Sequence, residues 1–451
     1  DMADKIIIPI AMGCVATFLI FWSLSGLLIK IFTSIKGVYY KGVNSFVLRQ
    51  FCSKINTTVF STTIICLMLF ITISVLSAAL SMKNSMSSDF KKMCPVDIQF
   101  TKISYEALKE AYATADKDSD DYEKTTKILE DSKLSISDTL KNNGFDVDEY
   151  LKNMTEYSVY QTGLEEMDTL GILADEICEK YPMVSFLSSV NFMKLSDYNK
   201  IATLYGNETY SLGDNEYLIV ANFKTVADIR NMALKAGTKI DINGKTYSPK
   251  YQECKDGFIE LASQHINDGI FIVPDDALTD SQLYKCGMTA DYKADSKEEK
   301  YDIENKLDDI SKNIFNQTSY LSYNSKIDLA EASVGLGALV TFIALYLGII
   351  FLISSAAILA LKELSDSADN RERYGMIRKI GVDEKMINMA LFKQIGIFFA
   401  FPLLLAIIHS VFGIKFINLI LQTMGMSSML ASVGITFVFL VVIYGGYFII
   451  T

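Results

Sequence analysis

Side chains that commonly perform chemistry are few in this chain and widely spaced. Its two histidines, His265 and His409, stand among residues that do not form the pattern of a nucleophilic triad. The phosphate-binding sequence GxxxxGK followed by Ser or Thr does not occur. No cysteine pair has the C-x-x-C spacing of a metal site. The sequence therefore predicts no catalytic residue, no metal site and no cofactor on this chain.

Four cysteines fall in one long polar stretch, at Cys94, Cys178, Cys254 and Cys286. Disulfides persist in oxidising compartments outside the cytosol, and four cysteines allow three pairings. The spacing does not decide between a disulfide and free thiols.

One short segment has the composition of a protein-docking surface. Residues 371–381 read RERYGMIRKIG, in which basic residues alternate with large apolar ones. A basic segment is attracted to an acidic groove, and apolar side chains add buried area to such a contact. The candidate contact residues are Arg371, Glu372, Arg373, Tyr374, Met376, Ile377, Arg378, Lys379, Ile380 and Gly381.

The elements that must hold this segment are long stretches almost free of charge. A transmembrane helix needs about 20 apolar residues, whereas a buried helix of a soluble core has a run of about 10 to 14. Five stretches are long enough, and the predicted spans are residues 6–33, 55–82, 332–361, 394–414 and 432–451. We therefore expect an α-helical membrane protein with five transmembrane helices.

Basic residues indicate which side of the membrane each connection faces, because cytoplasmic loops are rich in Lys and Arg. Residues 34–54 and residues 362–393 carry many basic residues, so both are expected in the cytoplasm. Residues 83–331 and the loop 415–431 are then extracellular, on a multi-pass protein of the plasma membrane. Membrane orientation alone would also explain the basic residues of 371–381. Tyr374 and Met376, however, add apolar surface that orientation does not require.

The extracellular segment, residues 83–331, is predicted to be an α+β domain. It holds 28 Lys and Arg against 45 Asp and Glu, a net charge of −17 compared with −11 for the whole chain. A net negative charge of this size attracts cationic ligands. The alternative explanation is that the charge only keeps the surface soluble. Helix-like stretches at 104–113 and 121–132 precede a region with strand patterns, where Asn243-Gly244 predicts a hairpin turn.

The two cytoplasmic connections predict different helices. Residues 40–56 place apolar residues at helical spacing with basic residues between, which is typical of an amphipathic helix in the inner headgroup layer. In residues 362–393, Gly381 predicts a helix end and Asp383 the start of the next helix. Two coupling helices with a break between them are expected there. The spans should also extend above the bilayer as a pair of stalks, at residues 81–90 and 328–333.

The segment RERYGMIRKIGVDEKMINMALFKQ resembles the cytoplasmic signature of FtsX-type permeases of ABC transporters. Within that superfamily, LRQFCSKINT, KLSDYNKIATLYG, NEYLIVAN and FPLLLAIIHS resemble the bacitracin-export, BceB-like type. The resemblance covers residues 47–451 and includes the order of spans and outer domain. Such permeases have ten spans, so the chain is expected to be the carboxy-terminal part of a longer protein.

The resemblance implies a permease subunit that confers resistance to cell-wall-targeting peptide antibiotics. It implies a cytoplasmic ABC ATPase in two copies, which binds ATP and Mg, so this chain itself is not an enzyme. Further implied partners are a sensor histidine kinase, a cationic or lipid-target-bound antimicrobial peptide, and membrane lipids, with no nucleic acid. ATP-driven movement of the ATPase would push on residues 371–381, and the spans would pass this movement to the extracellular domain, which frees the peptide.

Two other functions are compatible with the same layout. In one, the chain is a sensor or scaffold that signals the presence of a peptide to a histidine kinase or regulates a cell-wall hydrolase, with little transport. In the other, it is a lipoprotein or lipid extractor of related architecture. The size of the extracellular segment and the KLSDYNKIATLYG stretch favour the antibiotic-resistance permease.

Overall fold

The computed structural model describes residues 2–112, 122–181, 184–313, 321–423 and 430–450. The chain divides into two compact units. The helical unit comprises Asp1–Lys83, Gly337–Ile420 and Ser428–Thr451, and the sheet unit comprises Asn84–Leu336 and Leu421–Ser427.

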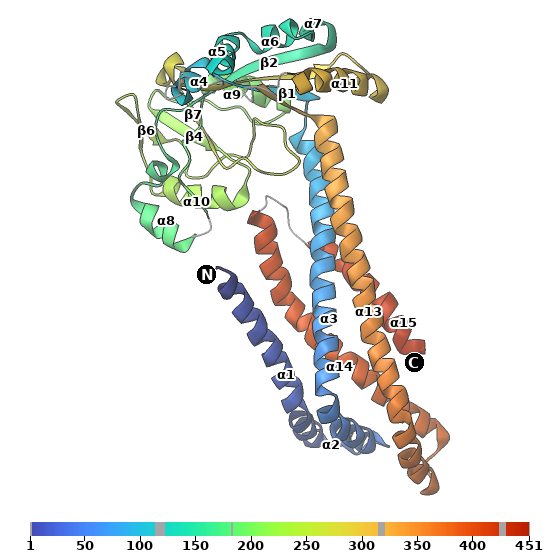
Figure 1. Cartoon of the computed structure of the whole chain (residues 1–451). Helices are drawn as coiled ribbons and strands as arrows, with labels where there is room; N and C mark the ends of the chain where they lie inside the picture. Colours follow the sequence, from blue (N-terminus) through green and yellow to red (C-terminus); the bar gives the residue numbers. More distant parts are fainter. Residues whose placement is uncertain (1, 113–121, 182–183, 314–320, 424–429, 451) are drawn as a thin grey trace. The chain divides into compact units, whose positions relative to one another are not determined.

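The helical unit is built from the predicted apolar stretches. Its helices are α1 (Met2–Ser34), α2 (Lys36–Tyr39), α3 (Asn44–Met93), α13 (Lys326–Lys379), α14 (Glu384–Thr423) and α15 (Leu430–Ile450), of which α3 and α13 continue into the sheet unit. Helices α3 and α13 lie side by side (Figure 1), and a methyl group at Gly348 would lie 3.4 Å from the Thr72 side chain. The Ser77 hydroxyl donates a hydrogen bond of 2.9 Å to Thr436, which ties α3 to α15.

Three of the described helices are long and apolar enough to cross a membrane, judged by length and composition. They are Thr58–Met93, Lys326–Lys362 and Glu384–Leu421. The apolar helices Ile7–Ser23 and Val433–Gly446 are shorter over their described residues. The second, third and fourth predicted spans therefore have the required helices, while the first and fifth stay predictions.

Helix boundaries differ from the predicted ones in two places. The third span and the first coupling helix form one unbroken helix, α13, because no Gly-Pro or turn sequence separates them. Helix α14 continues to Thr423, past the predicted span end at residue 414. A single charge at Lys415 does not stop a helix, since Lys has a good helix propensity, so the first part of the predicted loop 415–431 is helical. Residues 424–429 lie outside the described residues. The stalk segments at 81–90 and 328–333 are helical, as predicted.

Within the described residues of the sheet unit, nine strands form one mixed sheet in the order β5-β6-β4-β7-β3-β2-β8-β1-β9. The strands are β1 (Ile98–Ile103), β2 (Leu151–Tyr160), β3 (Phe192–Lys194), β4 (Glu216–Val220), β5 (Ile240–Ile242), β6 (Lys245–Pro249), β7 (Ile270–Val273), β8 (Leu283–Tyr292) and β9 (Leu321–Ser325). The pairs β3–β7 and β4–β6 are parallel, and the others are antiparallel. The α+β prediction for this segment is confirmed.

Helices cover the sheet and bury its apolar side chains. They are α4 (Tyr105–Ala111), α5 (Tyr122–Asp131), α6 (Ile136–Asn142), α7 (Val147–Tyr150), α8 (Ala174–Lys180), α9 (Leu195–Tyr205), α10 (Lys224–Lys235) and α11 (Lys297–Asn313), with short 3-10 helices η1 (Glu166–Leu173), η2 (Asp275–Ala277) and η3 (Asp280–Gln282). One core joins β1 and β8 to α6 and α11, and a second joins β2, β3 and β4 to α9.

The predicted hairpin is present between β5 and β6. Ile242 pairs with Lys245, which leaves Asn243 and Gly244 as the two turn residues, with φ angles of 53° and 79°. Two successive positive φ angles are those of a type I′ turn, and Asn-Gly is its preferred sequence.

The two long helices meet the sheet at neighbouring strands. Strand β1 follows α3, strand β9 precedes α13, and the two strands pair antiparallel from Ile98 opposite Ser325. The backbone N–H of Lys326 donates to the Asp97 carbonyl at 2.8 Å. The chain therefore enters and leaves the sheet unit at one edge of the sheet.

Candidate functional site

The predicted docking segment lies at a sharp connection between α13 and α14. Helix α13 ends at Lys379, and Gly381 has a φ of +92°. The N–H of Gly381 donates to the Arg378 carbonyl at 3.1 Å, and that of Val382 to the Ile377 carbonyl at 3.4 Å. This pair of bonds is the Schellman ending, in which a positive φ favours glycine. The predicted stop at Gly381 is confirmed, and α14 begins at Glu384 directly after Asp383. We call residues 371–391 the elbow.

One face of the elbow is buried. The side chains of Tyr374 and Ile377 are 6% and 9% exposed and pack with Ile387 and Ala390 of α14. The Tyr374 hydroxyl donates a buried hydrogen bond of 3.0 Å to Oε1 of Gln394. These contacts join the end of α13 to the start of α14.

The other face of the elbow is exposed. Met376 is 57% exposed and Ile380 is 81% exposed. Arg371, Glu372 and Lys379 are exposed as well. The candidate residues that the sequence grouped together are thus divided by the fold: Tyr374 and Ile377 maintain the elbow, while Met376 and Ile380 offer apolar surface beside charged side chains.

The basic residues of the elbow also divide into two kinds. Arg378 forms a two-point ion pair with Glu384, with Nε–Oε1 at 2.8 Å and Nη2–Oε2 at 3.0 Å, so it bridges the two helices across the turn. Arg373 donates through Nη1 to Oε1 of Gln50 at 2.6 Å. Both arginines therefore make contacts within the chain, although Arg378 is itself exposed. Arg371 and Lys379 are exposed as well.

The start of α3 belongs to the same cluster, which the sequence did not predict. Val47 is buried against the elbow with Val43 and Phe46 at its edge, and the Phe46 ring meets the Tyr374 ring edge-on at a centroid distance of 5.2 Å. The amphipathic helix expected in the headgroup layer at residues 40–56 instead buries this part of its apolar face in protein. Helical spacing shows that such a face exists but does not tell whether lipid or protein covers it.

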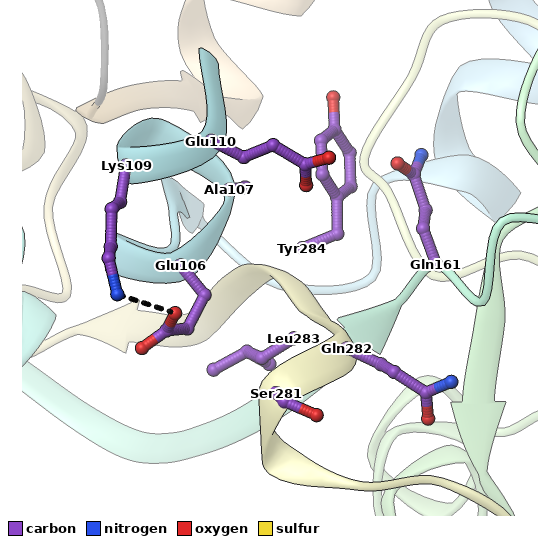
Figure 2. Close-up of a pocket in the computed structure, with 9 residues that line it drawn as sticks. All are labelled: Glu106, Ala107, Lys109, Glu110, Gln161, Ser281, Gln282, Leu283 and Tyr284. Carbon is purple, nitrogen blue, oxygen red and sulfur yellow. Dashed lines mark ion pairs between the residues drawn. The ribbon is translucent and has the colours of Figure 1, made fainter. Parts of the chain in front are cut away.

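The sheet unit has a surface cavity of about 320 Å³ beside α4. Figure 2 shows its lining residues, which come from α4, from the end of β2 and from the η3–β8 connection. Glu106 and Glu110 provide carboxylates, and Glu106 is 3.9 Å from Nζ of Lys109. The lining thus includes two carboxylates and one ammonium group.

The cysteines of the sheet unit are free thiols, at Cys94, Cys178, Cys254 and Cys286. Burial raises the pKa of Cys94 to about 11 and that of Cys254 to about 12, so both are protonated and unreactive at neutral pH. Among the described residues, no group of three His, Cys, Asp or Glu side chains is placed to hold a metal ion.

Comparison with known proteins finds permeases. The chain is 31% identical over 93 residues to the ABC transporter permease protein YxdM of Bacillus subtilis, a match that spans 21% of this chain and 15% of the relative. It is 34% identical over 92 residues to the bacitracin export permease protein BceB of Bacillus subtilis, over 20% of this chain and 14% of the relative. BceB of Halalkalibacterium halodurans is 28% identical over 105 residues, or 23% of this chain and 16% of the relative.

Each matched stretch covers about a sixth of its relative or less. No protein-family model matches the chain. The apolar helices and these three similarities nevertheless agree with the resemblance that the motifs indicated. The chain is a relative of the BceB-like permeases of ABC transporters.

Proposed function

We propose that the chain is an FtsX-like permease subunit that couples ATP hydrolysis on a partner chain to movement of the sheet unit, and so protects cells from peptide antibiotics that act on the cell wall. The observation that carries this proposal is the exposed face of the elbow. Permease relatives, including a bacitracin export permease, support the class of protein.

The exposed face has the chemistry of a docking surface. Full burial of a side chain such as Met or Ile stabilises a contact by about 1.5 to 3 kcal/mol. Met376 and Ile380 together therefore supply on the order of 3 kcal/mol or more, before any contribution from Arg371 and Lys379. An acidic groove on a cytoplasmic ABC ATPase is the proposed partner. That ATPase, in two copies, would bind ATP and Mg, and the elbow would contribute contact rather than chemistry.

The unbroken helices supply the mechanical connection in this proposal. Helix α13 has 54 residues, about 80 Å at 1.5 Å per residue, and reaches from Lys326 to the elbow. A push on the elbow therefore acts on the same helix that begins directly after β9. Rigid α-helices transmit displacement along their axis because every backbone hydrogen bond lies within the segment.

The proposed placement has residues 83–331 outside the plasma membrane and the elbow in the cytoplasm, from the basic residues that flank the spans. The negative charge of the outer segment would attract cationic peptides, and the cavity with Glu106 and Glu110 is a candidate contact for their basic side chains. A sensor histidine kinase and membrane lipids are further proposed partners.

The test is co-purification of the partner ATPase with single variants of the exposed face. Met376→Asp and Ile380→Asp should each reduce the bound ATPase about tenfold, because a charge replaces buried apolar area. Ile172→Asp is the matched control, since Ile172 of the sheet unit is 93% exposed. Undiminished assembly of both elbow variants would end the docking proposal. Tyr374 and Ile377 are unsuitable for this test because their replacement disrupts the elbow itself.

A deletion strain separates the permease from the sensor or scaffold alternative. The permease proposal expects the strain to become sensitive to bacitracin. The same strain should carry a reporter gene that is induced by the peptide. Loss of this induction with unchanged bacitracin tolerance would instead identify a sensor.

A further inference from the structure

The start of α3 is held to the elbow by polar contacts as well as by the apolar cluster. Gln50 is buried and accepts the 2.6 Å hydrogen bond from Arg373. Nearer the start of the same helix, Asn44 accepts a hydrogen bond of 2.9 Å from Nζ of Lys393 on α14. Both α13 and α14 therefore bind the first turns of α3, at positions more than 300 residues away in the sequence.

These contacts give the elbow a second rigid connection. Helix α3 runs without interruption from Asn44 to Met93. A short link then joins it to β1, which begins at Ile98. Helix α13 is connected to the elbow covalently, whereas α3 is connected only through side chains. The Arg373–Gln50 contact is part-buried, with Gln50 itself 7% exposed. Arg373 lies one turn before Met376 on α13, so the contact adjoins the exposed face without using Met376 or Ile380.

We propose that Gln50 is a positioning residue that couples α3 to the elbow, with Asn44 as a second, weaker contact. In this arrangement a displacement of the elbow moves α3 and α13 together. The inference rests on the proposed function, because it concerns how a push on the elbow is passed on. It adds a residue of the first cytoplasmic connection to a site that the sequence placed entirely in residues 371–381.

The expected effect follows from the type of contact. A hydrogen bond from a charged donor to a buried acceptor changes an equilibrium by roughly tenfold to a hundredfold when one partner is removed. Gln50→Ala removes the acceptor but leaves the exposed face of the elbow intact. The variant should retain ATPase binding and most ATP hydrolysis per complex, while bacitracin tolerance falls about tenfold. ATP would then be hydrolysed without protection of the cell.

The experiment uses the full-length permease with its ATPase, in cells and as the purified complex, with tolerance normalised to the amount of permease in the membrane. Ser45→Ala, on the same turns of α3, is the matched control and should behave as the unaltered protein. Gln50→Glu should retain tolerance, because a carboxylate also accepts from Arg373. Gln50→Ala combined with Arg373→Ala should lose no more tolerance than Arg373→Ala alone, since two members of one contact are not additive.

Unchanged tolerance of the Gln50→Ala variant would overturn the inference. So would a parallel loss of ATP hydrolysis and tolerance, which indicates a structural role, or a Gln50→Glu variant as defective as Gln50→Ala. A failure of the proposed function is distinguishable from all of these. In that event, the unaltered chain neither retains the ATPase nor confers bacitracin tolerance.

Discussion

We expect Glu304 to make the stability of the sheet unit depend on pH near neutrality. It lies on α11, is 6% exposed, and accepts a hydrogen bond of 2.9 Å from the Tyr292 hydroxyl. Burial raises the pKa of Glu304 from 4.5 to about 7, with further increase from the nearby carboxylates of Asp328 and Asp308. The hydrogen bonds from Tyr292 and Ser325 oppose this rise in pKa but do not cancel it.

The direction in which Glu304 changes the stability with pH follows from the direction of its pKa shift. A carboxyl whose pKa is higher in the folded chain binds its proton more tightly there, so it favours folding most below the unfolded value of 4.5. That contribution is lost as the pH rises through about 7. The shift corresponds to about 3 kcal/mol in total, of which about 1 kcal/mol is lost between pH 6 and pH 8.

The perturbation is Glu304→Gln, which keeps an oxygen to accept from Tyr292 and cannot ionise. Thermal unfolding of the purified chain in detergent, followed by circular dichroism at pH 6 and pH 8, gives the comparison. The Tm of the variant should rise relative to the unaltered chain by about 2 to 4 °C between the two pH values. Burial also raises the pKa of Asp328, so some pH dependence remains in the variant.

Glu298→Gln is the control, because Glu298 is exposed on the same helix and its replacement changes the net charge equally. It should leave the pH dependence as it is. If Glu304→Gln and the unaltered chain have the same difference in Tm between pH 6 and pH 8, then Glu304 is ionised in the folded protein and the reasoning fails.

Three further substitutions test packing in the two units. Arg230→Ala should destabilise the sheet unit by about 3 to 5 kcal/mol in chemical denaturation, because Glu166, paired with it at 2.8 Å, is left buried without a cation; a loss below about 1 kcal/mol would contradict this. Gly287→Ala makes a methyl group overlap the Tyr157 ring and should cost about 1 to 3 kcal/mol or more, a loss that shrinks when Tyr157 is also shortened to Leu. Gly413→Val in α14 places Cβ 2.6 Å from a ring of α3 and should reduce the folded chain recovered in detergent by size-exclusion chromatography, with normal recovery as the contrary result.

Much of the local structure could be predicted from the sequence because local chemistry determines it. The charge-free stretches became helices, the Asn243-Gly244 pair became a turn with two positive φ angles, and Gly381 ended α13. Each of these depends on residues within a few positions of one another. The same is true of the break between the two coupling helices.

The arrangement of the elbow could be predicted only in part. Tyr374 and Ile377 share one face of the helix at a spacing of three, and Met376 and Ile380 share another at a spacing of four. The sequence thus contains two apolar faces, and nothing local tells which one is buried. The choice depends on Val47, more than 300 residues earlier, and such pairings are not visible in a single sequence.

The adjacent attachment of α3 and α13 to the sheet restricts how these helices can move. Because β1 and β9 are paired from Ile98 opposite Ser325, sliding one helix lengthwise past the other would shear a ladder of backbone hydrogen bonds. Tilting or translating the pair as one body leaves that ladder intact. The β1–β9 pairing therefore opposes lengthwise sliding of α3 against α13 at the sheet, whereas the proposed Gln50 contact couples the opposite ends of these helices.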